Sequence, residues 1–358
     1  MPEGSYNEVS TKPSLRLVEG LARSIRTAPR FASWWQEHHT HFESEESAGP
    51  LWLAASSLLR VRAGSRAVAS LRPGLRPLRL TLHVGEEFPH LLTGLRAIDE
   101  PFALGLIERG DRLGHALALG LDPSVWVRDV PIARLRRWDR VLDLVWARRT
   151  CAEAHAPMDG SAYADLDREL RVHLGALGAD PGLGDALLTR LTDPWGIDHA
   201  VRDTTGDAAA RAIQVASTTS DRHTGWHEVI EVETERDLPW MLAVGRPISV
   251  RVARWQCVIE VNPSSNLLVG RLYTAFSQPL FHLPGERRDE PWAVPVLVGT
   301  DDPAVFATSL GDEFAYAWAG MVDAHDVPSG YARAWIDEAA AHSWRMRFTT
   351  PGVTRRTS

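Results

Sequence analysis

The sequence has few of the features that mark secreted, membrane-spanning or disulfide-stabilised proteins. Its 358 residues include only two cysteines, Cys151 and Cys257, which form no paired motif and suit a reducing cytosol. No apolar run approaches the ~18 residues that a membrane helix needs. The polar segment 1–12 lacks the charged and then apolar plan of a signal peptide. These absences predict a cytoplasmic protein that does not enter a membrane.

The charge pattern shows no clear nucleic-acid-binding surface. The formal net charge is −7, arginine far outnumbers lysine, and the basic residues form no continuous block. Hydrophobic residues make up 44% of the chain and charged residues 24%, which is typical of a globular protein. A chain of this length can bury one large core or two moderate ones. The composition therefore agrees with a soluble enzyme and says no more.

What the sequence does contain is a set of apolar runs that are each followed by polar residues. The four blocks are His83-Val84-Gly85-Glu86-Glu87, Asp111-Arg112-Leu113-Gly114-His115, Val258 to Asn266 and Thr300-Asp301-Asp302-Pro303. The apolar runs are typical of buried strands, and α/β barrels keep their chemistry at the C-terminal ends of such strands. A histidine, a glutamate and two aspartates placed there could hold a metal ion, activate water and move protons.

In this order the four blocks resemble the adenosine/AMP deaminase family. In that family a His-x-Gly-Glu block, a Gly-His block, a Pro-x-Ser-x block and a Thr-Asp-Asp-Pro block close the fifth to eighth strands of a zinc-bearing barrel. The similarity covers roughly residues 76–123 and 255–325, which is under half of the chain. One block alone would be a weak signal, since Asp-Asp-Pro is common in loops, whereas four blocks in order at strand ends are a strong one.

The resemblance implies a role for five residues. His83 and Asp301 would be ligands of a Zn²⁺ ion, and Glu86 would protonate the ring nitrogen beside the attacked carbon of a purine. His115 would orient the attacking water and help to deprotonate it, and Asp302 would hydrogen-bond the imidazole edge of the purine. The implied reaction is hydrolytic deamination at purine C6, which expels ammonia and leaves an inosine-type product.

Three of these residues also have a purely structural interpretation. His83 could be a satisfied core histidine at a strand end, and Asp301 and Asp302 could form an Asx turn or a helix cap before the following proline. The catalytic interpretation requires that the candidate side chains lie close together. We expect His83, Glu86, His115 and Asp301 to meet in one pocket at the C-terminal ends of parallel strands.

The chain differs from the family pattern by a long insertion. Between His115 and Pro263 there are 147 residues, where the family has little more than one helix. We therefore expect residues 151–254 to form an inserted lobe outside the barrel. Enlarged deaminases of the bacterial RADAR-type phage-defence systems also carry long insertions, and the chain is similar to them in architecture rather than in a motif.

The first half of the barrel has no counterpart in the sequence. Only 82 residues precede His83, too few for four βα units of ~30 residues each. The family also has a His-x-His pair that supplies two more zinc ligands. His39 and His41 have this spacing, and alternate residues of a strand share a face, but a surface loop or helix end fits them better, so they are not the expected ligands. We therefore expect weak or absent activity from this chain alone, since two ligands rarely hold zinc.

The expected fold is α/β, a partial TIM-type (β/α) barrel with strands 5–8 recognisable and an inserted lobe. The expected regions are an N-terminal helical region 1–75, a first barrel part 76–150, the lobe 151–254, a second barrel part 255–350 and a tail 351–358. The patterns predict strands at 78–84, 111–117, 256–262 and 294–299, with a further strand pair near 227–233 and 247–253. They predict helices at 14–26, 50–70, 89–107, 131–149, 311–323 and 329–343.

Three functions remain open at this point. The leading one is a zinc-dependent, adenosine deaminase-like hydrolase whose missing half comes from a neighbouring chain or was lost when the reading frame was defined. The second is a non-catalytic scaffold subunit of a deaminase-type defence complex, and the third is another metal-dependent amidohydrolase. The expected partners are a purine nucleoside or nucleotide and either further copies of the chain or a partner subunit. The sequence does not choose between adenosine and its nucleotides.

Overall fold

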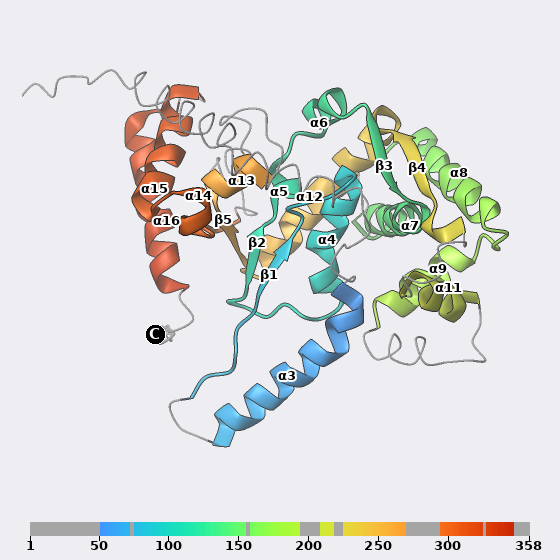
Figure 1. Ribbon diagram of the computed structural model, residues 1–358, viewed down its shortest axis with the longest axis horizontal. Helices are drawn as coiled ribbons and strands as arrows, with labels where there is room; N and C mark the ends of the chain where they lie inside the picture. The colour runs from blue at the N-terminus through green and yellow to red at the C-terminus, as the bar shows by residue number, and fades with distance from the viewer. Residues whose placement is uncertain are drawn as a thin grey trace, which may run out of the picture. The chain divides into compact units, whose positions relative to one another are not determined.

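The computed structural model describes most of the chain from residue 51 onward (Figure 1). The described residues are 51–71, 75–154, 158–193, 208–217, 225–269, 294–324 and 327–346. The helix expected at 14–26, the pair His39 and His41, and the tail 351–358 lie outside them. The chain forms two compact units. Of the described residues, the N-terminal unit holds those of 51–259 with 294–295, and the C-terminal unit holds 260–269, 296–324 and 327–346.

The N-terminal unit is mainly helical. Its α-helices are α3 (Leu51–Leu71), α4 (Leu91–Ala103), α5 (Leu117–Gly120), α6 (Pro123–Asp129), α7 (Arg137–Ala154), α8 (Gly160–Ala176), α9 (Leu183–Leu191), α11 (Ala208–Ser217) and α12 (Leu238–Arg254). Its short 3₁₀ segments are η1 (Gly225–His227) and η2 (Thr234–Asp237). Among all described helices of the chain, none is both long and apolar enough to cross a membrane.

The strands of the N-terminal unit are short, and one of them continues into the C-terminal unit. They are β1 (Thr81–Val84), β2 (Arg112–His115), β3 (Ile132–Arg136) and β4 (Val229–Glu233), with the first residues of β5 (Val258–Val261). The C-terminal unit adds the end of β5, then β6 (Val296–Val298), the α-helices α13 (Pro263–Val269), α14 (Pro303–Phe306), α15 (Leu310–Ala319) and α16 (Ser329–Arg345), and a π-helical turn, η5 (Gly320–Ala324). β6 is fully buried and β5 nearly so, as expected for central strands of α/β units, whereas β1, β3 and β4 each bury only one or two residues.

A four-stranded parallel sheet has the order β1-β2-β5-β6, so neighbours in the sheet follow the order of the chain. The Val258 N–H donates to Asp111 O at 3.3 Å, which joins β5 to the residue before β2. The Gly299 N–H donates to Val261 O at 2.9 Å, which joins the end of β5 to the residue after β6. These strands confirm the expected α/β class and the four expected strand positions. The described strands form no closed barrel, and closure stays a prediction.

Two predicted elements were wrong. Residues 131–149 were expected to be one helix, but the segment begins with β3, whose Ala133 and Leu135 are buried while Ile132 and Arg134 are exposed. This alternation is the period of a strand, and β3 pairs antiparallel with β4. The second strand expected near 247–253 lies inside α12.

The misread segment of α12 has helical rather than strand periodicity. Val244, Ile248 and Val252 are all fully buried, and they follow one another at intervals of four. Only the partner expected near 227–233 forms a strand, which is β4. Residues 151–254, expected as an inserted lobe, supply α8, α9, α11, β4 and α12, and they belong to the same compact unit as 76–150.

A buried ion pair joins three elements of the N-terminal unit. Arg140 of α7 and Asp237 of η2 are each 1% exposed, and Arg140 Nη2 donates to Asp237 Oδ1 at 3.0 Å. His90, the N-cap of α4, has its Nε2 3.2 Å from Asp237 Oδ2, while its Nδ1 accepts the Leu92 N–H. Burial alone would raise the pKa of Asp237, but the charge of Arg140 and hydrogen bonds from His90 and Arg140 lower it. This pair therefore fixes the start of α4 to α7 and η2.

We expect Asp237→Asn to lower the free energy of unfolding by about 3–5 kcal/mol, because Arg140 would stay buried without its counter-charge. Since the pKa of Asp237 is lowered in the folded protein, its contribution is complete above the ordinary pKa of aspartate, ~3.9, and is lost as the pH falls through the folded value. Urea unfolding at roughly pH 7, 5 and 3 measures this. The loss in free energy of unfolding that Asp237→Asn causes should be equal at the two higher pH values and smaller at the lowest. Asp165→Asn, at an exposed site of α8, is the control and should change little.

Candidate metal centre

Parallel pairing of β1 with β2 brings two histidines to the same end of the sheet. In the register, His83 lies opposite Gly114, and Val84 lies opposite His115, the last residue of β2. Glu86 follows β1 by two residues, beyond a glycine turn. The three candidate side chains therefore come from two neighbouring strand ends.

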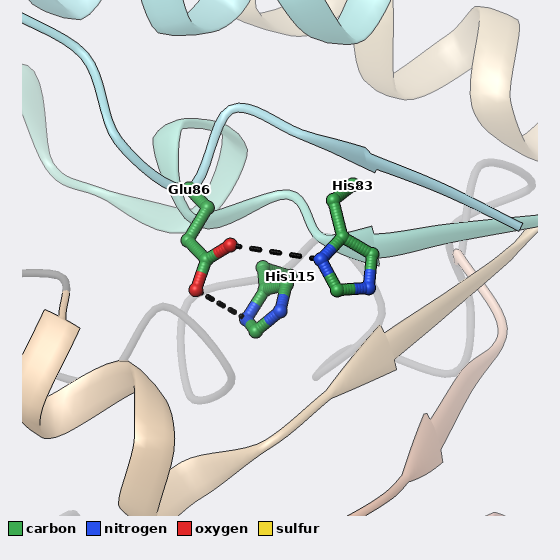
Figure 2. A group of neighbouring side chains, drawn as sticks. All are labelled: His83, Glu86 and His115. Atoms are coloured by element: carbon green, nitrogen blue, oxygen red, sulfur yellow. Dashed lines mark ion pairs between the residues drawn. The ribbon is translucent and has the colours of Figure 1, made fainter. Parts of the chain in front are cut away.

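Figure 2 shows the carboxylate of Glu86 directed toward both imidazole rings. Glu86 Oε1 lies 3.2 Å from His115 Nδ1, and Glu86 Oε2 lies 3.9 Å from His83 Nδ1. The rings of His83 and His115 meet edge to face, with centroids 4.7 Å apart and an interplanar angle of 75°. One potential ligand atom from each of the three residues lies within 4.8 Å of the other two. This group could hold a metal ion.

The three side chains differ in their access to solvent. The side chain of His115 is 0% exposed, that of Glu86 is 18% exposed and that of His83 is 60% exposed. The buried imidazole and the half-buried carboxylate would hold an ion from the protein side. Solvent or a substrate can reach the group beside His83. Such one-sided access is what a catalytic site needs and a closed structural site lacks.

The backbone turns sharply where β2 ends. His115 has φ 62° and Ala116 has φ 46°, so two successive residues with side chains adopt the left-handed region. This conformation is uncommon outside glycine and costs free energy. The turn is held by the Ala116 N–H, which donates to Val84 O at 3.1 Å and to Gly114 O at 2.8 Å. Strain of this kind concentrates at functional sites, which supports a role for His115 beyond packing.

Two imidazoles and one carboxylate match the donors of known catalytic metal sites. A His₂Glu set with an open fourth position is one of the standard catalytic zinc sites. Two histidines and one carboxylate with open positions also bind Fe²⁺. From the sequence, we assigned only His83 of these three residues to the metal, and the structure places Glu86 and His115 beside it. The chain therefore has three donors in one place without His39 or His41.

Gly114 makes room for His83. A Cβ added at Gly114 would lie 2.6 Å from Cδ2 and 3.2 Å from Nε2 of the His83 imidazole. Both distances are shorter than the ~3.5–4.0 Å at which such atoms pack. The missing side chain of Gly114 thus lets the His83 ring lie against β2 and close to His115.

We expect Gly114→Ala to displace the imidazole of His83 and to weaken binding of Zn²⁺ by about tenfold or more. The fold should survive, because His83 is more than half exposed and its ring can move into solvent. Isothermal titration with Zn²⁺ and thermal unfolding of the metal-free protein measure the two effects. Gly245→Ala in α12 is a matched control, since a Cβ there would meet nothing. Unchanged zinc affinity in Gly114→Ala would contradict the assignment of His83 as a ligand.

Asp301 and Asp302 belong to the C-terminal unit and follow the end of β6 by three and four residues. Asp301 has φ 55°, and its Oδ2 accepts a hydrogen bond from Ser265 Oγ at 2.6 Å. Ser265 is fully buried near the start of α13. Asp302 is exposed, and its backbone oxygen accepts the Phe306 N–H at 3.0 Å at the start of α14. The structure thus orients the Asp301 carboxylate within its own unit, and its convergence with His83 stays a prediction.

Sequence reasoning missed a buried carboxylate in the C-terminal unit. Glu313 of α15 is fully buried and accepts the Ser264 N–H at 2.9 Å and the Thr308 hydroxyl at 2.5 Å. Burial raises its pKa, and the hydrogen bonds from Thr308 and Ser264 oppose that shift in part. Glu313 thereby ties the segment after β5 to the segment after β6. The capping box of Ser309 and Asp312 marks the helix start in the sequence, but it does not show that the next residue is buried.

Comparisons with known proteins do not place the chain in a family. No protein-family model matches the sequence, and no curated protein is significantly similar to it. The resemblance to the adenosine/AMP deaminases therefore depends on the four sequence blocks alone.

Proposed function

We propose that this chain is a metal-dependent hydrolase of the adenosine/AMP deaminase type, which converts an adenine nucleoside or nucleotide to its inosine form. One observation carries this proposal: His83, Glu86 and His115 meet within 4.8 Å. Two separate sequence blocks supply these residues, and the resemblance assigns all three to one site. A scaffold protein has no physical need for such a group, because a half-buried carboxylate between two imidazoles contributes little to stability.

The order of the strands also supports the proposal. In a (β/α) barrel, each strand pairs with the next strand along the chain. The sheet order β1-β2-β5-β6 rises along the chain and differs from the reversed order of doubly wound folds, although β2 pairs with β5 because β3 and β4 form a separate two-stranded sheet. Asp301 lies three residues after the end of β6, in the loop where a barrel strand would carry a catalytic residue. These observations favour a partial TIM-type barrel whose remaining strands come from elsewhere.

The donors of the group fit Zn²⁺, and His83 with His115 would hold it. When bound, such an ion supplies a water molecule whose pKa is near neutrality. The resemblance gave His115 the role of orienting that water, but beside His83 and Glu86 it would instead be a ligand, with its ring fixed by the turn at the end of β2. Glu86 would carry a proton to the ring nitrogen beside C6 of the purine, which makes that carbon more electrophilic. Asp301 would supply a further carboxylate, and Asp302 would bind the purine edge.

Glu86 has a second possible role in this arrangement. Its carboxylate lies close enough to both histidines to be a third metal ligand, and a ligand cannot also act as a proton donor. The two roles differ in what Glu86→Gln does to metal binding. If Glu86 is a ligand, the variant loses zinc. If Glu86 is the proton donor, the variant keeps its zinc and loses turnover.

We expect the full chain to bind about one Zn²⁺ and to release ammonia slowly from adenosine, AMP or ATP. With Glu86 as the proton donor, we expect the Glu86→Gln variant to keep its zinc and to lose about 10²–10⁴-fold in turnover. The matched control is Glu87→Gln, which changes the neighbouring exposed carboxylate and should alter neither quantity. Metal content by elemental mass spectrometry and ammonia release are measured on the same samples.

Three outcomes would contradict parts of this proposal. A wild-type chain that binds no divalent ion would rule out the metal centre. Zinc binding without any deamination, even after the product of a neighbouring gene is added, would favour another metal-dependent amidohydrolase or a scaffold. Loss of zinc in Glu86→Gln would make Glu86 a ligand and would leave the proton donor unassigned.

A further inference from the structure

Apolar side chains that face solvent concentrate on α3 and the segment after it. Fifteen large hydrophobic residues are exposed in the described part of the chain, and five of them fall between residues 61 and 78. They are Val61, Val68, Leu71, Leu75 and Leu78, and each is at least 50% exposed. Single exposed apolar residues are normal, but a concentration of this kind marks an interaction surface.

One side of α3 attaches it to the N-terminal unit. Ala55, Ser56 and Arg62 are buried, and Arg62 Nη1 donates to Asp111 Oδ2 at 2.7 Å. Figure 1 shows α3, in blue, extending away from the sheet and from the other helices of this unit. From Ser57 to Leu71 the opposite side of the helix is exposed.

The open side of α3 carries a stripe of five residues, which we call the α3 stripe. Ser57, Val61, Gly64, Val68 and Leu71 follow one another at intervals of four and three, and all five are exposed. This spacing repeats every seven residues, which is the pattern of a helix that packs along a second helix. A Cβ added at Gly64 would meet nothing, so a second helix has room to approach closely.

We propose that the α3 stripe is a dimer interface, in which it packs antiparallel against the same stripe of a second copy of this chain. The positions of its first four residues are symmetric about the midpoint between residues 62 and 63. Across a twofold axis, Val61 would therefore lie opposite the partner's Gly64, and Val68 opposite the partner's Ser57. Each layer joins a branched side chain to a small one, which fills space evenly. Self-complementarity of this kind is what an isologous interface requires.

The distribution of charge favours a second copy over a nucleic acid or an acidic protein. No residue of the α3 stripe is charged. Arg62 and Arg66 are already paired with Asp111 and Glu108 of the same chain. A polyanion would need basic side chains along the contact, and its binding would weaken steeply with salt. Contact between two uncharged stripes needs no ion pairs and resists salt.

The proposed interface is small, so we expect a dissociation constant of about 1–100 μM. The α3 stripe includes no residue of the metal centre. A failure of this proposal therefore leaves the proposed hydrolase activity untouched, and a failure of that activity leaves the dimer untouched.

Disulfide trapping tests the geometry directly. Val61→Cys and Gly64→Cys are prepared separately, mixed and oxidised, and the product is read on a non-reducing gel. We expect the mixture to form a covalent dimer at least about tenfold faster than a mixture of Val61→Cys with Gly175→Cys. Gly175 is an exposed position of α8 where a Cβ would also meet nothing. The natural Cys151 and Cys257 are buried and should stay reduced.

Sedimentation equilibrium tests the interface without cross-linking. We expect wild-type protein to dimerise between about 1 and 100 μM, and Val68→Asp to weaken the dimer by about tenfold or more. Val172→Asp, at a position of α8 that is 59% exposed, is the matched control and should dimerise like wild type. Dimer that persists in ~0.5 M salt supports the apolar contact. A monomeric wild type, a Val68→Asp that dimerises normally, a dimer dissolved by salt, or trapping no faster than the Gly175→Cys mixture would each overturn the proposal.

Discussion

The pairing register between β1 and β2 is the constraint on which the candidate metal centre depends. With Val84 opposite His115, the His83 ring lies against Gly114 and 4.7 Å from the ring of His115. A slip of one residue would turn the side chains of β1 to the other face of the sheet and separate the two histidines. It would also place His83 opposite a residue with a side chain. Sheet pairing, the absence of one Cβ and the strained turn at His115 thus produce the site together.

The position of Glu86 depends on a second set of interactions, because this residue lies in the loop between β1 and α4. At the start of that loop, Gly85 has φ 62°, and a Cβ there would lie 2.7 Å from the side chain of Ile98 in α4. At its end, His90 caps α4 and lies against Asp237, which Arg140 neutralises. A short loop held at both ends keeps one carboxylate between two imidazoles. The stability of the buried ion pair and the geometry of the site are therefore linked.

The sequence predicted the parts of this arrangement that depend on local pattern. Each strand of the four-stranded sheet was expected within a few residues, because a buried parallel strand is a short apolar run that ends in polar residues. The helix expected at 131–149 was wrong in its first part, because two buried positions in five residues are too short a pattern to separate strand from helix. The closeness of Glu86 to both histidines, the buried Glu313 and the Asp237 cluster depend on contacts between distant segments. The sequence pattern within one segment does not show which distant segment it contacts.

X-ray absorption at the zinc edge of the zinc-loaded full chain tests the central claim most directly, because it counts the ligands by type. The account predicts two imidazole nitrogens at about 2.0–2.1 Å with the remaining ligands oxygen, and a loss of one imidazole in either His83→Ala or His115→Ala. A zinc shell without imidazole, or one that is unchanged in both variants, would show that the metal binds elsewhere and would contradict the account.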